Sequence, residues 1–220
     1  MLIASESRIL FIGDSITDCG RTQPVGEGLF APYGSGWVNI VAGLLGSTYP
    51  SRRLRLVNMG LSGNTSRDLV ARWDKDVLQH RPDWVVVMIG TNDVWRQFDL
   101  PLHPELHVLP DEYRRNLEKS IADTLPRVKG LVLMTPFFLE PLREDAMRRR
   151  MDEYSAIVRE TAEMHGQWFV DVQAAMDRLV RDQHSANIAW DRVHPNIIGH
   201  TAIARAFLDA VGYDWSGAVD

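Results

Sequence analysis

The stretch Arg8–Thr17, RILFIGDSIT, indicates how the whole chain folds. Its apolar run predicts a strand buried on both faces, which is typical of a parallel sheet. The Gly13-Asp14-Ser15 turn then ends the strand and brings polar side chains to its carboxyl end. Open sheets of parallel strands bind ligands at that edge, so a candidate site follows the first strand.

The same pattern recurs along the rest of the chain. Further apolar runs predict strands at Leu54–Asn58, Trp84–Ile89, Leu131–Thr135 and Trp168–Asp171. Apolar residues three or four apart predict helices at Trp37–Tyr49, Ser66–Leu78, Glu112–Leu125, Ala146–His165 and Ile197–Val211. Strand–helix alternation of this kind predicts the α/β class, with a five-stranded parallel sheet and helices on both faces.

Two connections are too long for simple turns, and we expect both to be loops. They are Asp18–Gly36, which holds five glycines, and Trp95–Leu109. Loops of this length in a compact domain are usually functional. Because both follow the carboxyl end of a strand, we expect them to form the walls of a crevice at that edge.

Composition narrows the classes of function. The chain has 220 residues, which suits one domain over residues 1–220, since single cores reach about 200–250 residues. The net charge of −5 argues against a nucleic-acid partner, and no run approaches the ~18 apolar residues of a membrane span. Cys19 is the single cysteine, so no intrachain disulfide can form. No signal peptide is visible in the first residues. We therefore expect a cytoplasmic enzyme.

Four short segments carry the candidate chemistry: Gly13–Thr17, Gly60–Asn64, Gly90–Asp93 and Asp191–Pro195. A serine hydroxyl is a weak nucleophile that needs a base within hydrogen-bond reach. Ser15 is our candidate nucleophile and His194 the candidate base, since imidazole titrates near neutral pH. Asp191, three residues earlier, is placed to orient the histidine and stabilise the imidazolium.

Acyl transfer also needs donors aimed at the developing oxyanion. We assign this role to the backbone N–H groups of Ser15 and Gly63 and to the side-chain amide of Asn92. Gly63 allows close approach and unusual dihedral angles because it lacks a side chain.

The surroundings of these groups suggest how a substrate is bound. We assign Asp14, Asn64, Trp95 and Trp190 to the substrate-binding environment. Asp14 and Asn64 are expected to hold the loops by hydrogen bonds. Trp95 and Trp190 are expected to border the crevice, where an aromatic face suits a pyranose ring. The other histidines show no zinc-site spacing, and we expect no metal. His200, inside the last predicted helix, should point away from the site.

Taken together, the four segments resemble the sequence blocks of the GDSL/SGNH hydrolases. Ser15, Gly63, Asn92 and His194 match the four letters S, G, N and H, and Asp191 matches the acidic residue before the histidine. The resemblance runs from Arg8 to about Phe207. It implies a three-layer α/β/α sandwich resembling flavodoxin, with no metal and no organic cofactor.

A narrower resemblance is to the acetylxylan esterases of this family. It is carried by GDSITDCGR from Gly13, IGTNDVWRQFD from Ile89, MTPFFLE from Met134 and AWDRVHPNIIGH from Ala189. It implies removal of acetyl groups from xylo-oligosaccharides, a small acetylated carbohydrate or other short-chain ester as ligand, and a homo-oligomer as an allowed state.

Three alternatives stay open from the sequence. A metallophosphoesterase would need further His and Asp ligands, and the chain lacks Asp-x-His after the first strand and Gly-Asn-His. A non-catalytic carbohydrate-binding protein would be expected to lack a triad residue. The third alternative keeps the chemistry and changes the substrate, to a simple short-chain ester, a thioester or a lysophospholipid.

Overall fold

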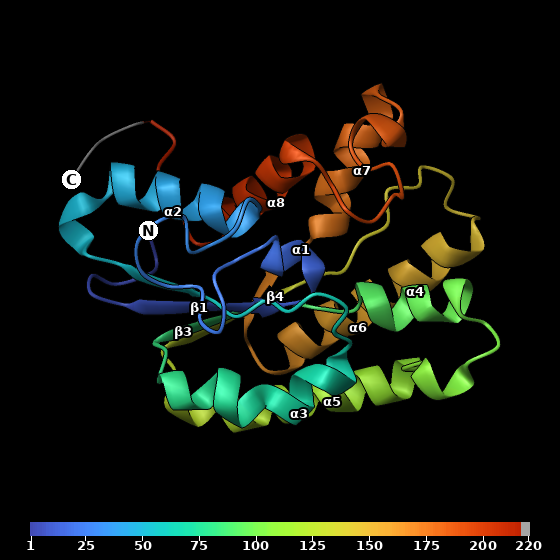
Figure 1. The fold of residues 1–220 in the computed structure, drawn as a ribbon, viewed down its shortest axis with the longest axis horizontal. Coiled ribbons are helices and arrows are strands. Elements are labelled where there is room, and N and C mark those ends of the chain that lie inside the picture. Colours follow the sequence, from blue (N-terminus) through green and yellow to red (C-terminus); the bar gives the residue numbers. More distant parts are fainter. Residues whose placement is uncertain (217–220) are drawn as a thin grey trace.

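The computed structural model describes residues 1–216 and is built on one five-stranded sheet (Figure 1). The strands lie in the order β2–β1–β3–β4–β5, and every neighbouring pair is parallel. The predicted five-stranded parallel sheet is therefore confirmed. The strands are β1 (Arg8–Gly13), β2 (Arg55–Asn58), β3 (Trp84–Met88), β4 (Gly130–Met134) and β5 (Trp168–Val170).

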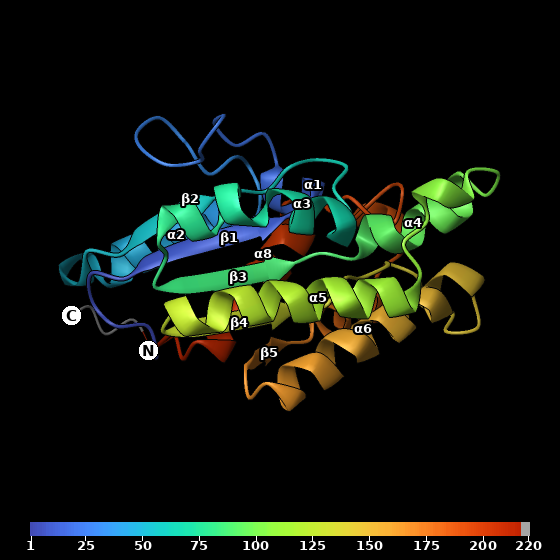
Figure 2. The same cartoon turned by 90° about the horizontal axis from the view of Figure 1, so that it is seen from below.

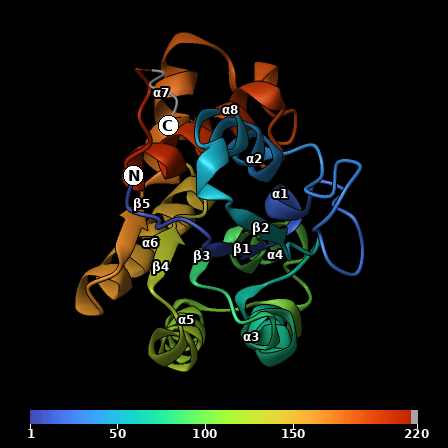
Figure 3. The same ribbon diagram turned by 90° about the vertical axis from the view of Figure 1, so that its left-hand side faces the viewer.

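Helices cover both faces of the sheet, which gives the expected three-layer α/β/α sandwich (Figure 2 and Figure 3). On one face lie α2 (Trp37–Thr48), α7 (Val172–Asp182) and α8 (Ile197–Ala210). On the other lie α3 (Ser66–Asp76), α5 (Pro110–Thr124) and α6 (Ala146–Met164). The short α1 (Ser15–Asp18) and α4 (Thr91–Asp99) follow β1 and β3 directly.

The alternation of side chains along β1 explains why the sheet has two cores. Ile9 and Phe11 point into the core beneath α2 and α8, and Leu10 and Ile12 into the core beneath α3, α5 and α6. All four are fully buried. This is the outcome predicted from the continuous apolar run.

The expectation for one of the two long loops was wrong. Trp95–Leu109 is not a loop throughout, because Trp95–Asp99 forms the second half of α4 and Pro104–Leu106 forms a short 3-10 helix. Gly90, with φ of +129°, turns the chain directly from β3 into α4, and Val94 packs fully buried in the core. The other expected loop follows α1 and contains no helix in residues 19–36.

Helix α7 was not predicted. Its apolar residues Val172, Ala175 and Met176 have helical spacing, and the side chain of Asp171 caps its first turn. This helical spacing is present in the sequence, but it involves only a few apolar residues.

Candidate active site

The candidate nucleophile lies at the junction of β1 and α1. Ser15 is the first residue of α1, and the Asp14 side chain caps this helix by accepting from the N–H of Ile16 at 3.0 Å. The first N–H groups of a helix have no partner within it. The backbone N–H of Ser15, our candidate oxyanion donor, is one of these groups.

Ser15, His194 and Asp191 form one continuous hydrogen-bond chain. The Oγ of Ser15 lies 2.8 Å from Nε2 of His194, and Nδ1 of His194 lies 2.6 Å from Oδ2 of Asp191. The other carboxylate oxygen, Oδ1, accepts from the backbone N–H groups of Val193 and His194 at 2.9 and 2.8 Å. Asp191 therefore holds both the imidazole ring and the backbone of its own loop.

These hydrogen bonds decide the charge state of Asp191. Burial alone raises its pKa, but the hydrogen bonds from His194 and Val193 outweigh burial, so the pKa lies below its ordinary value. Near neutral pH the carboxylate is ionised and accepts the Nδ1–H of His194. That tautomer leaves Nε2 free to take the Ser15 proton.

The loop that carries the histidine is held by contacts that the sequence analysis missed. Arg192 adopts a left-handed φ of +62°, which is uncommon for a residue with a side chain. Its carbonyl accepts from the N–H of Leu139 at 2.9 Å, and its guanidinium bonds Glu140 at 2.6 Å. The loop is thereby joined to the segment after β4.

Gly63 lies in the loop after β2, and Asn92 lies in the first turn of α4, directly after β3. Gly63 has a φ of +84°, which favours glycine. The Asn92 amide donates to the carbonyl of Asn64 at 2.9 Å, while its oxygen accepts from Arg96 at 3.3 Å. These partners fix which end of the amide is nitrogen and leave one N–H of Asn92 for a ligand.

Two buried carboxyl groups lie beneath the candidate site. Asp14 and Asp93 are 1% and 0% exposed, and burial raises the pKa of Asp14 to about 6 and that of Asp93 to about 7. The N–H and hydroxyl of Ser66 donate to Asp93, at 3.0 and 2.5 Å. Asp14, assigned to the substrate-binding group, is too deeply buried to touch a substrate and instead holds the turn at Ser15. Asn64 likewise holds its loop, through Arg72 at 2.6 Å.

The two tryptophans differ in their placement. The ring of Trp95 lies 5.6 Å from that of His194, centroid to centroid, so it borders the site. Trp190, next to Asp191 in the chain, is 90% exposed. Trp190 therefore leaves an aromatic face available to a ligand, whereas the Trp95 ring also lies against the Arg96 guanidinium, 5.2 Å from its centroid.

His200, which we expected to point away from the triad, lies against Cys19, the residue that follows α1. It is 7% exposed, and its Nε2 lies 3.4 Å from the Sγ of Cys19. Burial, with a smaller contribution from His194, lowers the pKa of His200 to about 4. Burial, together with Asp18 and Asp14, raises the pKa of the Cys19 thiol to about 12. The pair is therefore neutral near pH 7.

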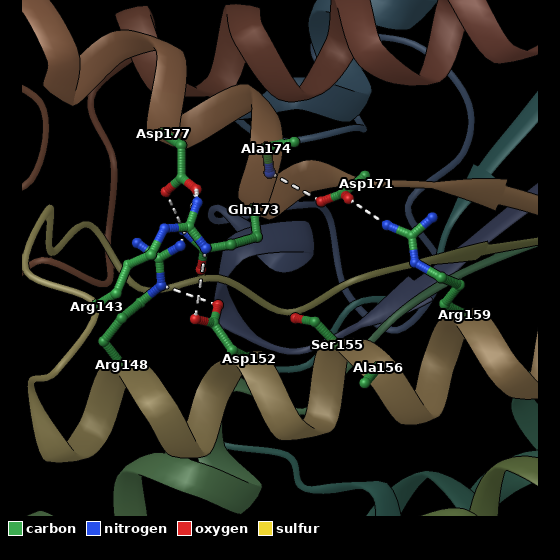
Figure 4. Close-up of a pocket in the computed structure, with 10 residues that line it drawn as sticks. All are labelled: Arg143, Arg148, Asp152, Ser155, Ala156, Arg159, Asp171, Gln173, Ala174 and Asp177. Carbon is green, nitrogen blue, oxygen red and sulfur yellow. Dashed lines mark hydrogen bonds and ion pairs between the residues drawn. The ribbon is translucent and has the colours of Figure 1, made fainter.

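A charged cavity of about 280 Å³ lies apart from the triad, between α6 and α7 (Figure 4). Its arginine and aspartate side chains are paired with one another, and Arg148, its most buried charge, bonds both Asp152 and Asp177. The other charged residues lining it are Arg143, Arg159 and Asp171.

Within residues 1–216, no group of three or more His, Cys, Asp or Glu side chains is placed to hold a metal ion. No helix of this part of the chain combines the length and apolar character needed to cross a bilayer.

This arrangement suits acyl transfer. A base contacts a serine hydroxyl and a carboxylate orients the base, while the three candidate N–H donors belong to α1, the Gly63 turn and α4. His194 and Asp191 keep 45% and 35% of their side chains exposed, so a bulky ester can approach from solvent.

Comparisons with known proteins agree with this geometry. The model of the GDSL-like lipase/acylhydrolase family matches residues 11–202. An acetylxylan esterase of Geobacillus stearothermophilus is 52% identical over 98% of both chains, and its crystal structure superposes with a TM-score of 0.97. LAE5, an α/β hydrolase from the metagenome of Lake Arreo, is 55% identical over 97% of this chain and 98% of its own, with a TM-score of 0.95.

Three further crystal structures of the Geobacillus enzyme are described as catalytic mutants, S15A, D191A and H194A. Each is 52% identical to this chain, covers 98% of it and superposes with a TM-score of 0.97. The match of sequence, fold and family model shows that this chain belongs to the GDSL-like lipase/acylhydrolase family.

Proposed function

We propose that the protein is a serine esterase that removes acetyl groups from acetylated xylo-oligosaccharides. The observation that carries this proposal is the Ser15–His194–Asp191 hydrogen-bond chain. It is supported by a relative, 52% identical over 98% of the chain, that is named an acetylxylan esterase. In that relative, the three substitutions described as catalytic mutants bear the numbers of Ser15, Asp191 and His194 here.

The chemistry follows from the positions of the protons. Ser15 Oγ attacks the acetyl carbonyl while Nε2 of His194 takes its proton, 2.8 Å away. The backbone N–H groups of Ser15 and Gly63 and the free amide N–H of Asn92 bind the oxyanion. The sugar alcohol leaves with the proton from His194. Water then attacks the acyl-enzyme by the same route, which releases acetate and restores Ser15.

The sugar is proposed to lie against the aromatic faces beside the triad. Trp95 flanks His194, and Trp190 is 90% exposed next to Asp191. An apolar face with polar groups at its edge suits a pyranose ring. The half-exposed triad also fits an acyl group carried on a wide oligosaccharide rather than on a narrow chain.

We further propose that the enzyme is homo-oligomeric and cytoplasmic. Trp215, which is 44% exposed, is a large aromatic residue that an interface between copies would bury. The lone Cys19, 3.4 Å from His200, suits a reducing compartment. Sedimentation velocity tests the first point, and a single monomeric species at micromolar concentration would refute it. Fractionation of the source cells tests the second.

The deciding experiment compares three esters with wild type and Ser15→Ala. The esters are acetylated xylo-oligosaccharide, p-nitrophenyl acetate and p-nitrophenyl octanoate. Acetate release from the sugar that Ser15→Ala abolishes supports the whole proposal. Ser15-dependent turnover of only the synthetic acetate favours a short-chain carboxylesterase, and turnover of the octanoate a lipid-directed enzyme. Turnover that survives Ser15→Ala would overturn the nucleophile.

A further inference from the structure

Arg72 on α3 contacts two of the segments that carry the candidate oxyanion donors, the β1–α1 junction and the turn after β2. Its Nε donates to Oδ1 of Asn64 at 2.6 Å, and its Nη2 donates to the carbonyl of Gly13 at 3.2 Å. Its Nη1 donates to the carbonyl of Met59 and to Asp76, both at 2.9 Å. The side chain is 13% exposed, so these bonds are largely shielded from water.

These acceptors lie immediately beside the donors. Gly13 ends β1 two residues before Ser15, while Met59 and Asn64 bracket the turn that contains Gly63. The same Gly13 carbonyl also accepts from the N–H of Leu61 at 3.0 Å. The guanidinium thus joins the Ser15 segment to the Gly63 turn across the carboxyl ends of β1 and β2.

The third donor is linked through the same asparagine. The backbone carbonyl of Asn64 accepts from the Asn92 amide at 2.9 Å, while its side chain is held by Arg72. A shift of Asn64 would therefore move the partner that orients Asn92. Each donor is thus connected to Arg72 through neighbouring residues, Ser15 through Gly13, and Gly63 and Asn92 through Asn64.

We propose that Arg72 is a positioning residue that sets the spacing of the Ser15, Gly63 and Asn92 donors. The proposal rests on the esterase function above. Arginine suits the role because its rigid, planar fork serves acceptors in several directions, whereas lysine donates from one nitrogen. Asp76 accepts from the same guanidinium and gives its charge a partner.

The test is Arg72→Lys, which keeps the positive charge but loses the fork. Displacing a donor by a fraction of an ångström weakens binding of the oxyanion more than binding of the neutral ester. We expect kcat for p-nitrophenyl acetate to fall about 10- to 100-fold, with KM changed less than about threefold. A loss confined to KM would overturn the proposal.

Arg67 on the same helix provides a matched control. Its guanidinium also makes several bonds, to Glu112 at 2.6 and 2.9 Å and to the carbonyls of Glu105 and His107 at 3.0 Å. None of these partners belongs to the candidate site. Arg67→Lys should leave kcat unchanged, and equal losses of kcat in both variants would mean that Arg72 acts only on the stability of α3.

Chemical rescue gives a second, independent test of the role of Arg72. Arg72→Ala should recover part of its kcat when millimolar guanidinium is added, whereas Arg67→Ala should not respond. Melting temperatures establish that each variant is folded, and Arg72→Lys carries the test if Arg72→Ala is not. Wild-type turnover that Ser15→Ala abolishes establishes the esterase itself. Full activity of Arg72→Lys against that background would overturn only the role of Arg72.

Discussion

Replacing Asp191 with asparagine tests the proposed mechanism most directly. Oδ1 of Asp191 already accepts from two backbone N–H groups, so asparagine should keep its oxygen there and place its NH₂ where Oδ2 now meets His194. An NH₂ donor facing Nδ1 forces the proton of neutral His194 onto Nε2. The nitrogen that contacts Ser15 then cannot act as a base.

The expected loss has two parts. Charge centres about 4 Å apart attract by about 1 kcal/mol in water and about 4 kcal/mol at an effective dielectric of 20. The side chains of His194 and Asp191 are 45% and 35% exposed, which places the pair between these limits. Losing this stabilisation of the imidazolium lowers kcat by about 5- to 1000-fold. The wrong tautomer adds to it, and we expect kcat to fall about 10³- to 10⁴-fold in total.

The assay is steady-state acetate release, with KM and melting temperature measured alongside. We expect KM and the melting temperature to change little, because the loop keeps its backbone hydrogen bonds. Asp182→Asn, at an exposed acid at the end of α7, is the matched control and should retain full activity. A loss below tenfold in folded Asp191→Asn would refute the assigned role.

Three further predictions concern the oxyanion donor, pH and the core. Asn92→Ala should lower kcat about 10²- to 10³-fold with little change in KM, measured on p-nitrophenyl acetate; an effect on KM alone would contradict the oxyanion role. Burial lowers the pKa of His200 to about 4 in the folded protein, from about 6.5 in the unfolded chain. The fold therefore holds the neutral imidazole, and its stability falls as the pH is lowered from 6.5 towards 4. His200→Gln should therefore reduce the loss of unfolding free energy between pH 7 and pH 4 by about 3 kcal/mol in urea titrations, and an unchanged loss would argue against burial of a neutral imidazole. Phe207→Ala removes a fully buried ring that packs edge-on against Phe11 and should cost about 3–5 kcal/mol of unfolding free energy; a cost under 1 kcal/mol would show that this core repacks freely.

Local patterns predicted most of the scaffold. The continuous apolar runs identified all five strands, because strands buried on both faces need apolar residues throughout. Helix α4 was missed because the Gly90–Asp93 segment resembles a turn. Its helical conformation depends on the positive φ of Gly90 and on the packing of Val94, and the local sequence does not indicate either.

The candidate site was also predictable in its residue types but not in its support. Ser15, Asp191 and His194 were chosen by chemistry and spacing. In the structure His194 contacts both of the others, with Nε2 at 2.8 Å from the Ser15 Oγ and Nδ1 at 2.6 Å from the Asp191 Oδ2. Arg72 and Arg192 were not chosen. An arginine on an amphipathic helix or an exposed loop normally faces solvent, and nothing in its neighbours indicates a bond to a distant carbonyl.

The residues alone indicate the fold class and the chemical groups available, because burial pattern and functional-group chemistry are properties of the residues. Which groups meet depends on how the chain packs. Ser15 and His194 are 179 residues apart, and they come into contact because parallel strands bring their carboxyl ends to one edge of the sheet. The direction of the Asn92 amide likewise depends on its hydrogen bond to the carbonyl of Asn64, 28 residues away in the chain. Hydrogen bonds are short and directional, so they exist only once the packed helices and strands have set the distances.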